Sequence, residues 1–395
     1  MTAAPTRHPG LVDGPVYLDY NATTPVDPRV VEAMAPHLVE AFGNPSSGHS
    51  YSTGPRQALA RARARVANLI GAGPHEVVFT ASGSEANSLA VRGAVLASGR
   101  PDAHVITQAT EHPAVLESCR ALRRLHGVRL TVLPVDRDGV VDPDELTAAL
   151  TEDTVLVSVM AANNETGALQ PIAELAARAH DRGALVHCDA AQAAGKIPLD
   201  VRALGVDVLT VVGHKMYAPK GIGALYVRDG VDLEPLVHGG GQERGLRAGT
   251  ENVAFAVALG VAAELAVAEL ADGAATRVAA LRDRLHQHLV DGLPGRVHLN
   301  GPERDRLPNT LNISVDGVLG HDVLAAAPAI AASTGSACHS GTHTPSPVLT
   351  AMGVDTGRAL GAVRLSLGRW SSGADIVTAA AALVEGVRAA TPGNR

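Results

Sequence analysis

The sequence has few aromatic residues and no long apolar run. Aromatic residues make up 2% of its 395 residues, although apolar residues as a whole make up 46%. A core with so few rings must be built from closely packed Ala, Val and Leu, as in proteins of alternating helix and strand layers. No stretch approaches about eighteen uninterrupted apolar residues, and the N-terminus lacks the apolar core of a signal peptide. We therefore expect a soluble, cytoplasmic protein with no membrane partner.

Cysteine and basic runs are also scarce. Cys119, Cys188 and Cys338 are an odd number of thiols at long spacings. Neither a disulfide framework nor a paired Cys-x-x-Cys metal site has this pattern, so a reducing compartment fits best. The formal net charge is −7 and no long basic run occurs. This balance argues against nucleic acid as a partner.

Short β-branched runs alternate with Ala-rich helical segments between about residues 76 and 230. The runs are VVFT, HVIT, RLTVL, VLVSVM, ALVHC, DVLTVV and ALYV. Strands and helices that alternate with short connections form right-handed crossovers, with helices on both faces of a mainly parallel sheet. The sequence therefore predicts an α/β fold.

The chain is longer than one ordinary domain, which favours one large and one smaller unit. Long helices are expected over about 253 to 270 and 277 to 291, followed by the strand-like runs NTLNISV and AVRLSLG and a final helix. We expect a flexible extension over 1–16, a large domain over 17–254 and a small domain over 255–395. The small domain then carries the cysteine-containing loop, 333 to 347.

Two residues in this pattern could bind a carbonyl cofactor. Lys215 follows the apolar run DVLTVV, where partial burial would disfavour its ammonium form and leave an amine able to form a Schiff base. Asp189 ends the run ALVHCD, at the sheet edge where α/β proteins bind ligands, and could keep a pyridine nitrogen protonated. The alternatives are a solvated loop lysine and a helix-capping aspartate.

Two further segments follow predicted strands. In SGSEAN, Gly83 and Ser84 open a helix whose free N–H groups favour a phosphate, unless Ser82 or Ser84 simply caps it. In TEHPAVLESC, His112 precedes Pro113 at a helix start and could stack on a flat ring and move protons. A hydrogen-bonded loop histidine is the alternative.

Three more segments could contact a substrate. Asn163 and Asn164, in NNETG, suit either ligand contact or a turn, and the guanidinium of Arg364 suits a carboxylate or a surface ion pair. Cys338 lies in a loop of small polar residues beside His339 and His343, the setting of a reactive thiolate. A surface cysteine without function and a zinc site with the two histidines are the alternatives.

Ten motifs occur in one order along nearly the whole chain. They are YLDYNATTP, FGNPSSGHS, FTASGSEAN, TEHPAVLESC, SVMAANNETG, VHCDAAQAAGK, GHKMYAPKGIGALYV, GGGQERGLRAGTEN, STGSACHSGTHTPSPVLTAMG and RLSLGR. From about residue 17 to 372 this set resembles the cysteine desulfurases, pyridoxal-phosphate enzymes of the class-V aminotransferase group. The cysteine loop is similar to that of their iron–sulfur and nitrogen-fixation branch.

The resemblance implies pyridoxal-phosphate fold type I, with a seven-stranded sheet in a cofactor-binding large domain and an α+β small domain. It also implies roles for individual residues. Lys215 would hold the cofactor, Asp189 would pair with the ring nitrogen and His112 would stack on the ring. Gln192 and Asn164 would contact ring or substrate oxygens, and the phosphate would be held by Gly83, Ser84 and His214. Thr250 would reach the neighbouring subunit's phosphate in a homodimer, and Arg364 would bind the substrate carboxylate.

The implied reaction converts L-cysteine to L-alanine. Cys338 would take the sulfur as a persulfide and pass it to an acceptor protein, with Lys215 and His112 moving protons and no metal required. A selenocysteine lyase or another class-V lyase or aminotransferase is the alternative, and a non-catalytic scaffold is disfavoured because Lys215, Asp189, His112 and Cys338 are all present. Val212 stands where the family usually has a phosphate-binding serine, so one phosphate contact is expected to be missing.

Overall fold

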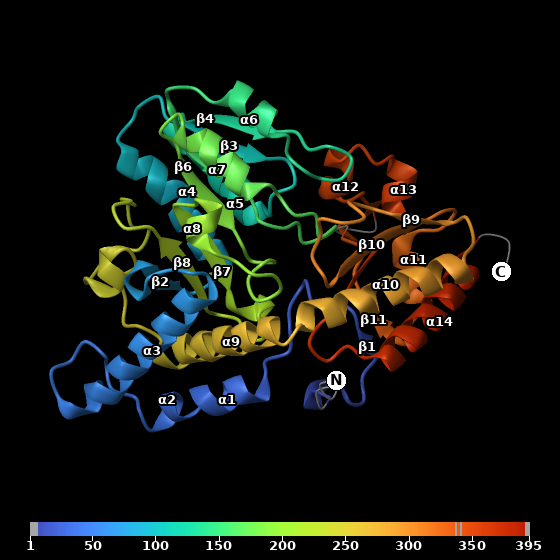
Figure 1. Ribbon diagram of the computed structural model, residues 1–395, viewed down its shortest axis with the longest axis horizontal. Helices are drawn as coiled ribbons and strands as arrows, with labels where there is room; N and C mark the ends of the chain where they lie inside the picture. The colour runs from blue at the N-terminus through green and yellow to red at the C-terminus, as the bar shows by residue number, and fades with distance from the viewer. Residues whose placement is uncertain (1–6, 336–337, 340–341, 392–395) are drawn as a thin grey trace.

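The chain folds into a large and a small lobe joined by two long helices (Figure 1). The computed structural model describes residues 7–335, 338–339 and 342–391, with only the backbone described at 338–339 and 342–343. In Figure 1 the large lobe lies at the upper left and the small lobe at the right, and α9 (Val253–Ala271) and α10 (Ala274–Gly292) run nearly end to end from the lower part of the large lobe into the small lobe. The chain passes from one lobe to the other through these helices.

The large lobe contains a seven-stranded sheet with the order β2-β8-β7-β6-β5-β3-β4. Six strands run in one direction, and β8 alone is antiparallel to its two neighbours. The mainly parallel seven-stranded sheet predicted from the sequence is therefore confirmed. The strands are β2 (Val77–Thr80), β3 (His104–Gln108), β4 (Arg129–Leu133), β5 (Thr154–Ser158), β6 (Leu185–Asp189), β7 (Val208–Val212) and β8 (Gly223–Val227).

Helices cover both faces of this sheet. On one face Leu209 and Val211 belong to a core shared with α3 and α9, and on the other Val208 belongs to a core shared with α4 and α5. This alternation follows from the opposite directions of successive side chains in a strand. The remaining helices of the lobe are α1 (Pro28–Met34), α2 (Pro36–Val39), α3 (Thr53–Leu69), α4 (Gly83–Ser98), α5 (Pro113–His126), α6 (Pro143–Ala149), α7 (Ile172–His180) and α8 (Val201–Leu204).

Helix α9 is apolar all round and packs inside the large lobe. Its length and composition alone would allow it to cross a membrane, but 56% of its apolar window is buried within the protein. It packs against α1 and α3, and Gly260 allows its backbone to approach Ala62 of α3 closely. Core helices of soluble proteins share these features.

The small lobe packs an antiparallel sheet, ordered β14-β10-β9, against α10 and α14. The predicted strands NTLNISV and AVRLSLG form β10 and β14, whereas the three-residue β9 was not predicted. The elements are β9 (Val297–Leu299), β10 (Thr310–Val315), α11 (Gly320–Ala325), β11 (Ile330–Ala331), β12 (Cys338–His339), β13 (Thr342–His343), α12 (Pro347–Ala351), α13 (Thr356–Leu360), β14 (Ala362–Ser366) and α14 (Gly373–Ala390).

The N-terminal segment contacts the small lobe. Strand β1 (Val16–Tyr17) pairs in parallel with β11, and Leu18 belongs to the small-lobe core. The His8 ring lies 4.7 Å from the ring of Trp370. The boundaries at 16/17 and 254/255 stay predictions, while the change from the large-lobe core to the small-lobe core occurs between α9 and α10.

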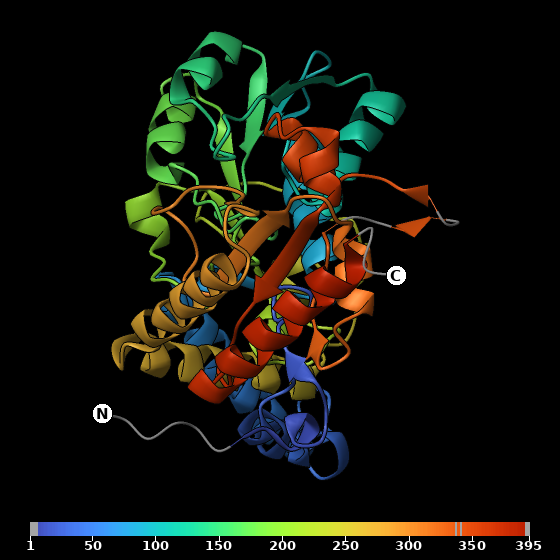
Figure 2. The same cartoon turned by 90° about the vertical axis from the view of Figure 1, so that its right-hand side faces the viewer.

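The cysteine-containing segment forms a short hairpin. Cys338 pairs with His343, and His339 pairs with Thr342, in the antiparallel strands β12 and β13. In Figure 2 these two strands extend outward from the small lobe. The side chains of Cys338, His339 and His343 lie outside the described part, so the predicted thiolate and its zinc alternative stay predictions.

Candidate active site

One edge of the large sheet collects most of the predicted site residues. His112 follows β3, Asn164 follows β5, Asp189 ends β6 and Lys215 follows β7, and these strands all run in the same direction. The carboxyl ends of parallel strands meet at one edge, which is where α/β proteins bind ligands. Because β8 is antiparallel to both β2 and β7, β2 also ends at this edge and brings the start of α4 to it.

A cavity of about 460 Å³ lies at this edge, a size within the range of small-molecule and cofactor sites. It is lined by nine of the residues predicted from the sequence: Gly83, Ser84, His112, Asn164, Asp189, Gln192, His214, Lys215 and Arg364. Thr250 is exposed and lies outside this lining. The structure therefore brings these nine residues together around one space.

Lys215 is held at the cavity by the chain's N-terminal segment. It ends a short 3-10 helix, Gly213–Lys215, and its Nζ donates to the carbonyl oxygens of Asn21 at 2.6 Å and Ala22 at 2.7 Å. Burial and the nearby Arg364 lower the pKa of Lys215 to about 8, although Asp19 and Asp189 oppose the shift. About a tenth of this amine is therefore uncharged and nucleophilic at pH 7, far more than for an ordinary lysine.

Asp189 is buried at the end of β6 and is held on both carboxylate oxygens. Oδ2 accepts from Asn87 Nδ2 at 2.6 Å, and Oδ1 accepts from the backbone N–H of Ala191 at 2.9 Å. The Oδ1 atom of Asn87 is buried without a protein partner among the described residues. A fixed carboxylate in this position can pair with a protonated ring nitrogen.

His112 caps α5 and also lines the cavity. Its Nδ1 accepts from the N–H of Ala114 at 3.1 Å, so the proton of the neutral ring lies on Nε2. Burial lowers the pKa of His112, and Lys215 acts in the same direction, while Asp189 opposes the shift. The ring is therefore neutral at pH 7 and can present a donor to the cavity through Nε2.

The start of α4 forms the end of the cavity suited to an anion. Ser82 caps this 16-residue helix by accepting from the N–H of Glu85 at 3.1 Å, which leaves Gly83 and Ser84 at the cavity wall. Exposed N–H groups and the helix dipole favour a phosphate here. A Cβ on Gly83 would lie 2.4 Å from Cγ2 of Val212, so only glycine fits against this valine.

His214 lies at the same end of the cavity. Its Nδ1 is 3.1 Å from Oγ1 of Thr23, and burial together with Lys215 and Lys220 lowers its pKa to about 4. The ring is therefore neutral at pH 7 and could contact a phosphate as a hydrogen-bonding group. Val212 also lines the cavity and presents methyl groups there. This is the position at which a serine contact to the phosphate was predicted to be missing.

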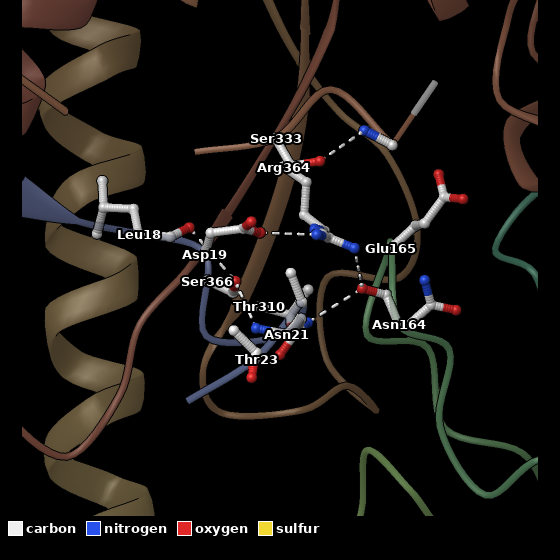
Figure 3. A network of polar contacts seen from close by, with 12 residues as sticks. Leu18, Asp19, Asn21, Thr23, Asn164, Glu165, Thr310, Ser333, Arg364 and Ser366 are labelled. Carbon is white, nitrogen blue, oxygen red and sulfur yellow. Dashed lines mark hydrogen bonds and ion pairs between the residues drawn. The ribbon is translucent and has the colours of Figure 1, made fainter. Parts of the chain in front are cut away.

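Arg364 reaches the cavity from the small lobe (Figure 3). Its Nη2 forms an ion pair with Asp19 Oδ1 at 2.7 Å, and its Nη1 donates to the carbonyl oxygen of Asn164 at 3.3 Å. The backbone of Arg364 also pairs with Ser333, which lies just before the cysteine-containing hairpin. The guanidinium could bind a substrate carboxylate by exchanging one of these partners.

Four polar residues in or next to the site were not predicted from the sequence. Asn21 is buried and lines the cavity, and the partly buried Lys196 donates to it. Glu111 and Glu165 are also buried, and each directly follows or precedes a predicted site residue in the chain. Their positions next to predicted residues could have indicated the two acids. The composition could have indicated Lys196, because the chain has only three lysines and all lie between 196 and 220.

The two missed acids are held in strongly desolvated surroundings. Burial and the charge of Asp189 raise the pKa of Glu111 to about 8, although its Oε1 accepts from the N–H of Met160 at 2.5 Å. Burial raises the pKa of Glu165 to about 7, and its Oε2 accepts from Oγ of Ser346 at 2.6 Å. Glu111 is therefore protonated in most molecules at pH 7, and Glu165 titrates near that pH.

Cys119 and Cys188 have no access to this cavity. Both are free thiols in the core, with exposed fractions of 1% and 0%. Burial raises the pKa of Cys119 to about 12 and that of Cys188 well above its ordinary value. Neither is suited to be a nucleophile, which leaves Cys338 as the candidate thiol.

Known proteins are similar to this chain over most of its length. The Aminotransferase class-V family matches residues 16–378. The chain is 46% identical over 363 residues, 91% of each chain, to a protein named cysteine desulfurase IscS from Dictyoglomus turgidum. A structure described as a NifS-like protein superposes with a TM-score of 0.88 at 37% identity, covering 95% of this chain and 99% of that one. A structure described as SspA in complex with cysteine has a TM-score of 0.79 at 34% identity, covering 90% and 99%.

Proposed function

Since the chain belongs to the class-V aminotransferase family and is a cysteine desulfurase, we propose that its cavity binds pyridoxal phosphate through Lys215 and that Cys338 takes the sulfur of L-cysteine. One observation carries this proposal. A buried amine with a pKa of about 8, a fixed carboxylate and a helix N-terminus all face one cavity, as this cofactor requires.

The residues present fit the cofactor along its whole length. The N–H groups of Gly83 and Ser84, together with His214, would hold the phosphate, and His112 would lie against the ring. Asp189 would pair with the ring nitrogen, while Gln192 and Asn164 would contact ring or substrate oxygens. When bound, the cofactor supplies an electron sink that stabilises negative charge at the substrate Cα.

The chain's own groups then orient the substrate and move its protons. Arg364 would bind the L-cysteine carboxylate, exchanging its long bond to the Asn164 carbonyl for a shorter, charge-assisted one. Lys215, freed from the carbonyls of Asn21 and Ala22, is placed to take the Cα proton. His112 can give a proton from Nε2, but it can take one at Nδ1 only by breaking its bond to Ala114.

Cys338 would complete the reaction as its thiolate. A new S–S bond forms between Cys338 and the substrate sulfur, the substrate C–S bond breaks, and L-alanine remains after protonation. Cys338 keeps a persulfide for an acceptor protein, such as an iron–sulfur cluster scaffold or another sulfur carrier. The outward position of β12 and β13 in Figure 2 supports delivery to an external partner.

We also propose a cytoplasmic homodimer with shared sites. Thr250 is exposed outside its own cavity, as required of a residue that reaches the phosphate of a neighbouring subunit. Sedimentation of the 40.4 kDa chain is expected to give a particle of twice that mass. A monomer at all concentrations that still forms alanine and sulfide would contradict this part of the proposal.

The test of function follows both products of L-cysteine. The protein loaded with pyridoxal phosphate and given reductant should release alanine and sulfide in equal amounts. Cys338→Ala should abolish sulfide release and leave the absorbance of the bound cofactor unchanged. Cys119→Ala serves as the matched control, because this thiol is buried away from the cavity, and it should retain activity.

Three outcomes would count against the proposal. Neither product from the loaded wild-type protein would contradict the activity. Sulfide release that survives in Cys338→Ala would contradict the role of this thiol. Efficient selenide release from selenocysteine with little activity on cysteine would favour a selenocysteine lyase.

A further inference from the structure

Asn21 is buried, is bonded at every polar atom and joins the two lobes beside the cavity. Figure 3 shows it with its partners Asn164, Thr310 and Ser366. From the large lobe, its carbonyl oxygen accepts from Lys215 and Gln192, its Oδ1 accepts from Lys196, and its Nδ2 donates to the carbonyl oxygen of Asn164. From the small lobe, its remaining partners are Ser366, Thr310 and Asn309. Such a fully satisfied buried amide has one orientation only.

Gln192 lies between Asn21 and Lys196 and lines the cavity. Its Nε2 donates to the Asn21 carbonyl oxygen at 3.0 Å, and its Oε1 accepts from Lys196 Nζ at 2.6 Å. The two partners have opposite and fixed polarity, because a carbonyl oxygen can only accept while the lysine here donates. A turned amide would place two donors together and two acceptors together, so this orientation is enforced.

The consequence concerns the second hydrogen of Gln192 Nε2. One N–H is used by Asn21, and the other is left for the cavity that Gln192 lines. The cavity is therefore offered a hydrogen-bond donor at this wall. The ring oxygen of pyridoxal phosphate carries negative charge when deprotonated and would be stabilised by such a donor.

We propose that Lys196 is a positioning residue that fixes the amide of Gln192 with its N–H toward the ring oxygen of pyridoxal phosphate. This inference rests on the proposed function, because the ring oxygen belongs to that cofactor. Lys196 acts through Gln192 and does not hold the cofactor itself. It lines a smaller adjoining cavity of about 50 Å³, whereas Lys215 lines both cavities.

Composition supports a specific role for this lysine. The chain has 33 lysines and arginines together, of which only Lys196, Lys215 and Lys220 are lysines. Lys220 is exposed, while Lys196 is held by Gln192 Oε1 and by Asn21 Oδ1 at 3.0 Å. Burial, with the charges of Lys215 and Arg364, lowers the pKa of Lys196 well below its usual value. Burying a lysine in this way is energetically unfavourable, so we expect this lysine to have a specific function.

Lys196→Met tests the inference by removing the donor while keeping a side chain of similar length. The readout is the pH at which the absorbance of the bound cofactor changes, which does not depend on turnover. Weaker donation to the ring oxygen should move this pH upward by about 0.5 to 1 unit. Lys196→Arg, which keeps a donor at the position, should bring the value back toward that of the wild type.

Lys220→Met is the matched control, since it makes the same change at the exposed lysine and should leave this pH unchanged. An unshifted value in Lys196→Met with cofactor bound would overturn the inference and leave the proposed function intact. A wild-type protein that binds no pyridoxal phosphate would instead overturn the proposed function.

If Lys196→Met fails to fold, a structure of the loaded wild type decides the question. Gln192 Nε2 should then lie about 3 Å from the ring oxygen. A carboxamide oxygen turned toward the ring, or an amide remote from it, would overturn the inference.

Discussion

At the scale of single residues, the site depends on how burial changes the charge of a few groups. Desolvation and neighbouring positive charges lower the pKa values of Lys215, His112 and His214. Glu111 is kept largely protonated by burial and by Asp189. The cavity therefore contains two neutral imidazoles and an amine that loses its proton near pH 8, next to a carboxylate fixed by hydrogen bonds, which suits imine chemistry.

The pKa of Lys215 predicts how fast the apoprotein takes up its cofactor. Only the uncharged amine attacks an aldehyde, and lowering the pKa to about 8 places the charge change within the working range. The rate of covalent binding, followed by absorbance, should rise about tenfold per pH unit below 8 and level off above it.

Free Nα-acetyllysine gives the reference for this rate. Its amine has the ordinary pKa of about 10.4, so its rate should keep rising to that pH. A protein rate that follows the same curve up to pH 10 would show that Lys215 is not desolvated.

Val212 predicts a gain of affinity by substitution. The valine presents methyl groups beside Gly83, at the position where the resemblance predicts that a serine contact is missing. Val212→Ser should lower the dissociation constant for pyridoxal phosphate about three- to tenfold, the effect of one added hydrogen bond. Equilibrium dialysis measures this change.

Val212→Ala separates the hydroxyl from the loss of methyl groups. It should leave affinity unchanged or weaker, while both variants lose about 1 kcal/mol of stability through the cavity they create. Equal affinities for the serine and alanine variants would contradict a phosphate contact at this position.

At the scale of elements, the sequence predicted the parts that follow from local patterns. All seven strands of the large sheet were predicted, because each is a β-branched run bounded by turns or helices. Strands β1 and β9 gave no such signal, since they have only two and three residues and exist through pairing with distant strands. Pairing of this kind depends on the completed fold.

The same distinction explains which site residues were predicted. Asp189 ends a strand, and Lys215 and His112 come a few residues after one, so their place at the sheet edge could be inferred from the pattern. Asn21 and Lys196 could not be found in this way, because Asn21 comes from a segment that passes between the lobes and the two meet across 175 positions of sequence. Only the folded chain shows that they fix Gln192.

The contact between α3 and α9 predicts a packing defect. A Cβ added to Gly260 would lie 2.6 Å from Cα of Ala62 and 3.0 Å from its Cβ. Gly260→Ala should therefore destabilise the large lobe by about 1–3 kcal/mol through overpacking. Thermal unfolding should show a midpoint lowered by several degrees.

Gly54→Ala is the matched control, because nothing lies within 4 Å of the added Cβ near the start of α3. It should be neutral or stabilising by up to about 1 kcal/mol, since alanine favours a helix. A Gly260 variant as stable as the Gly54 variant would contradict the close approach of the two helices.

At the scale of the whole molecule, the cavity belongs to both lobes. The large lobe supplies the amine, the carboxylate and the helix N-terminus, and the small lobe supplies Arg364. Asn21 connects the two by bonds to residues of each lobe, and Asp19 forms an ion pair with Arg364 of the small lobe. Movement of one lobe relative to the other would therefore alter how Arg364 binds a substrate carboxylate.

The central claim is that Lys215 forms the covalent bond to pyridoxal phosphate, and chemical trapping tests it most directly. Borohydride reduces the carbon–nitrogen double bond, after which peptide mapping locates the labelled residue. The chain offers three lysines for this label, Lys196, Lys215 and Lys220. Label confined to Lys215 is the predicted result, and label on either other lysine, or no label at all, would contradict the account.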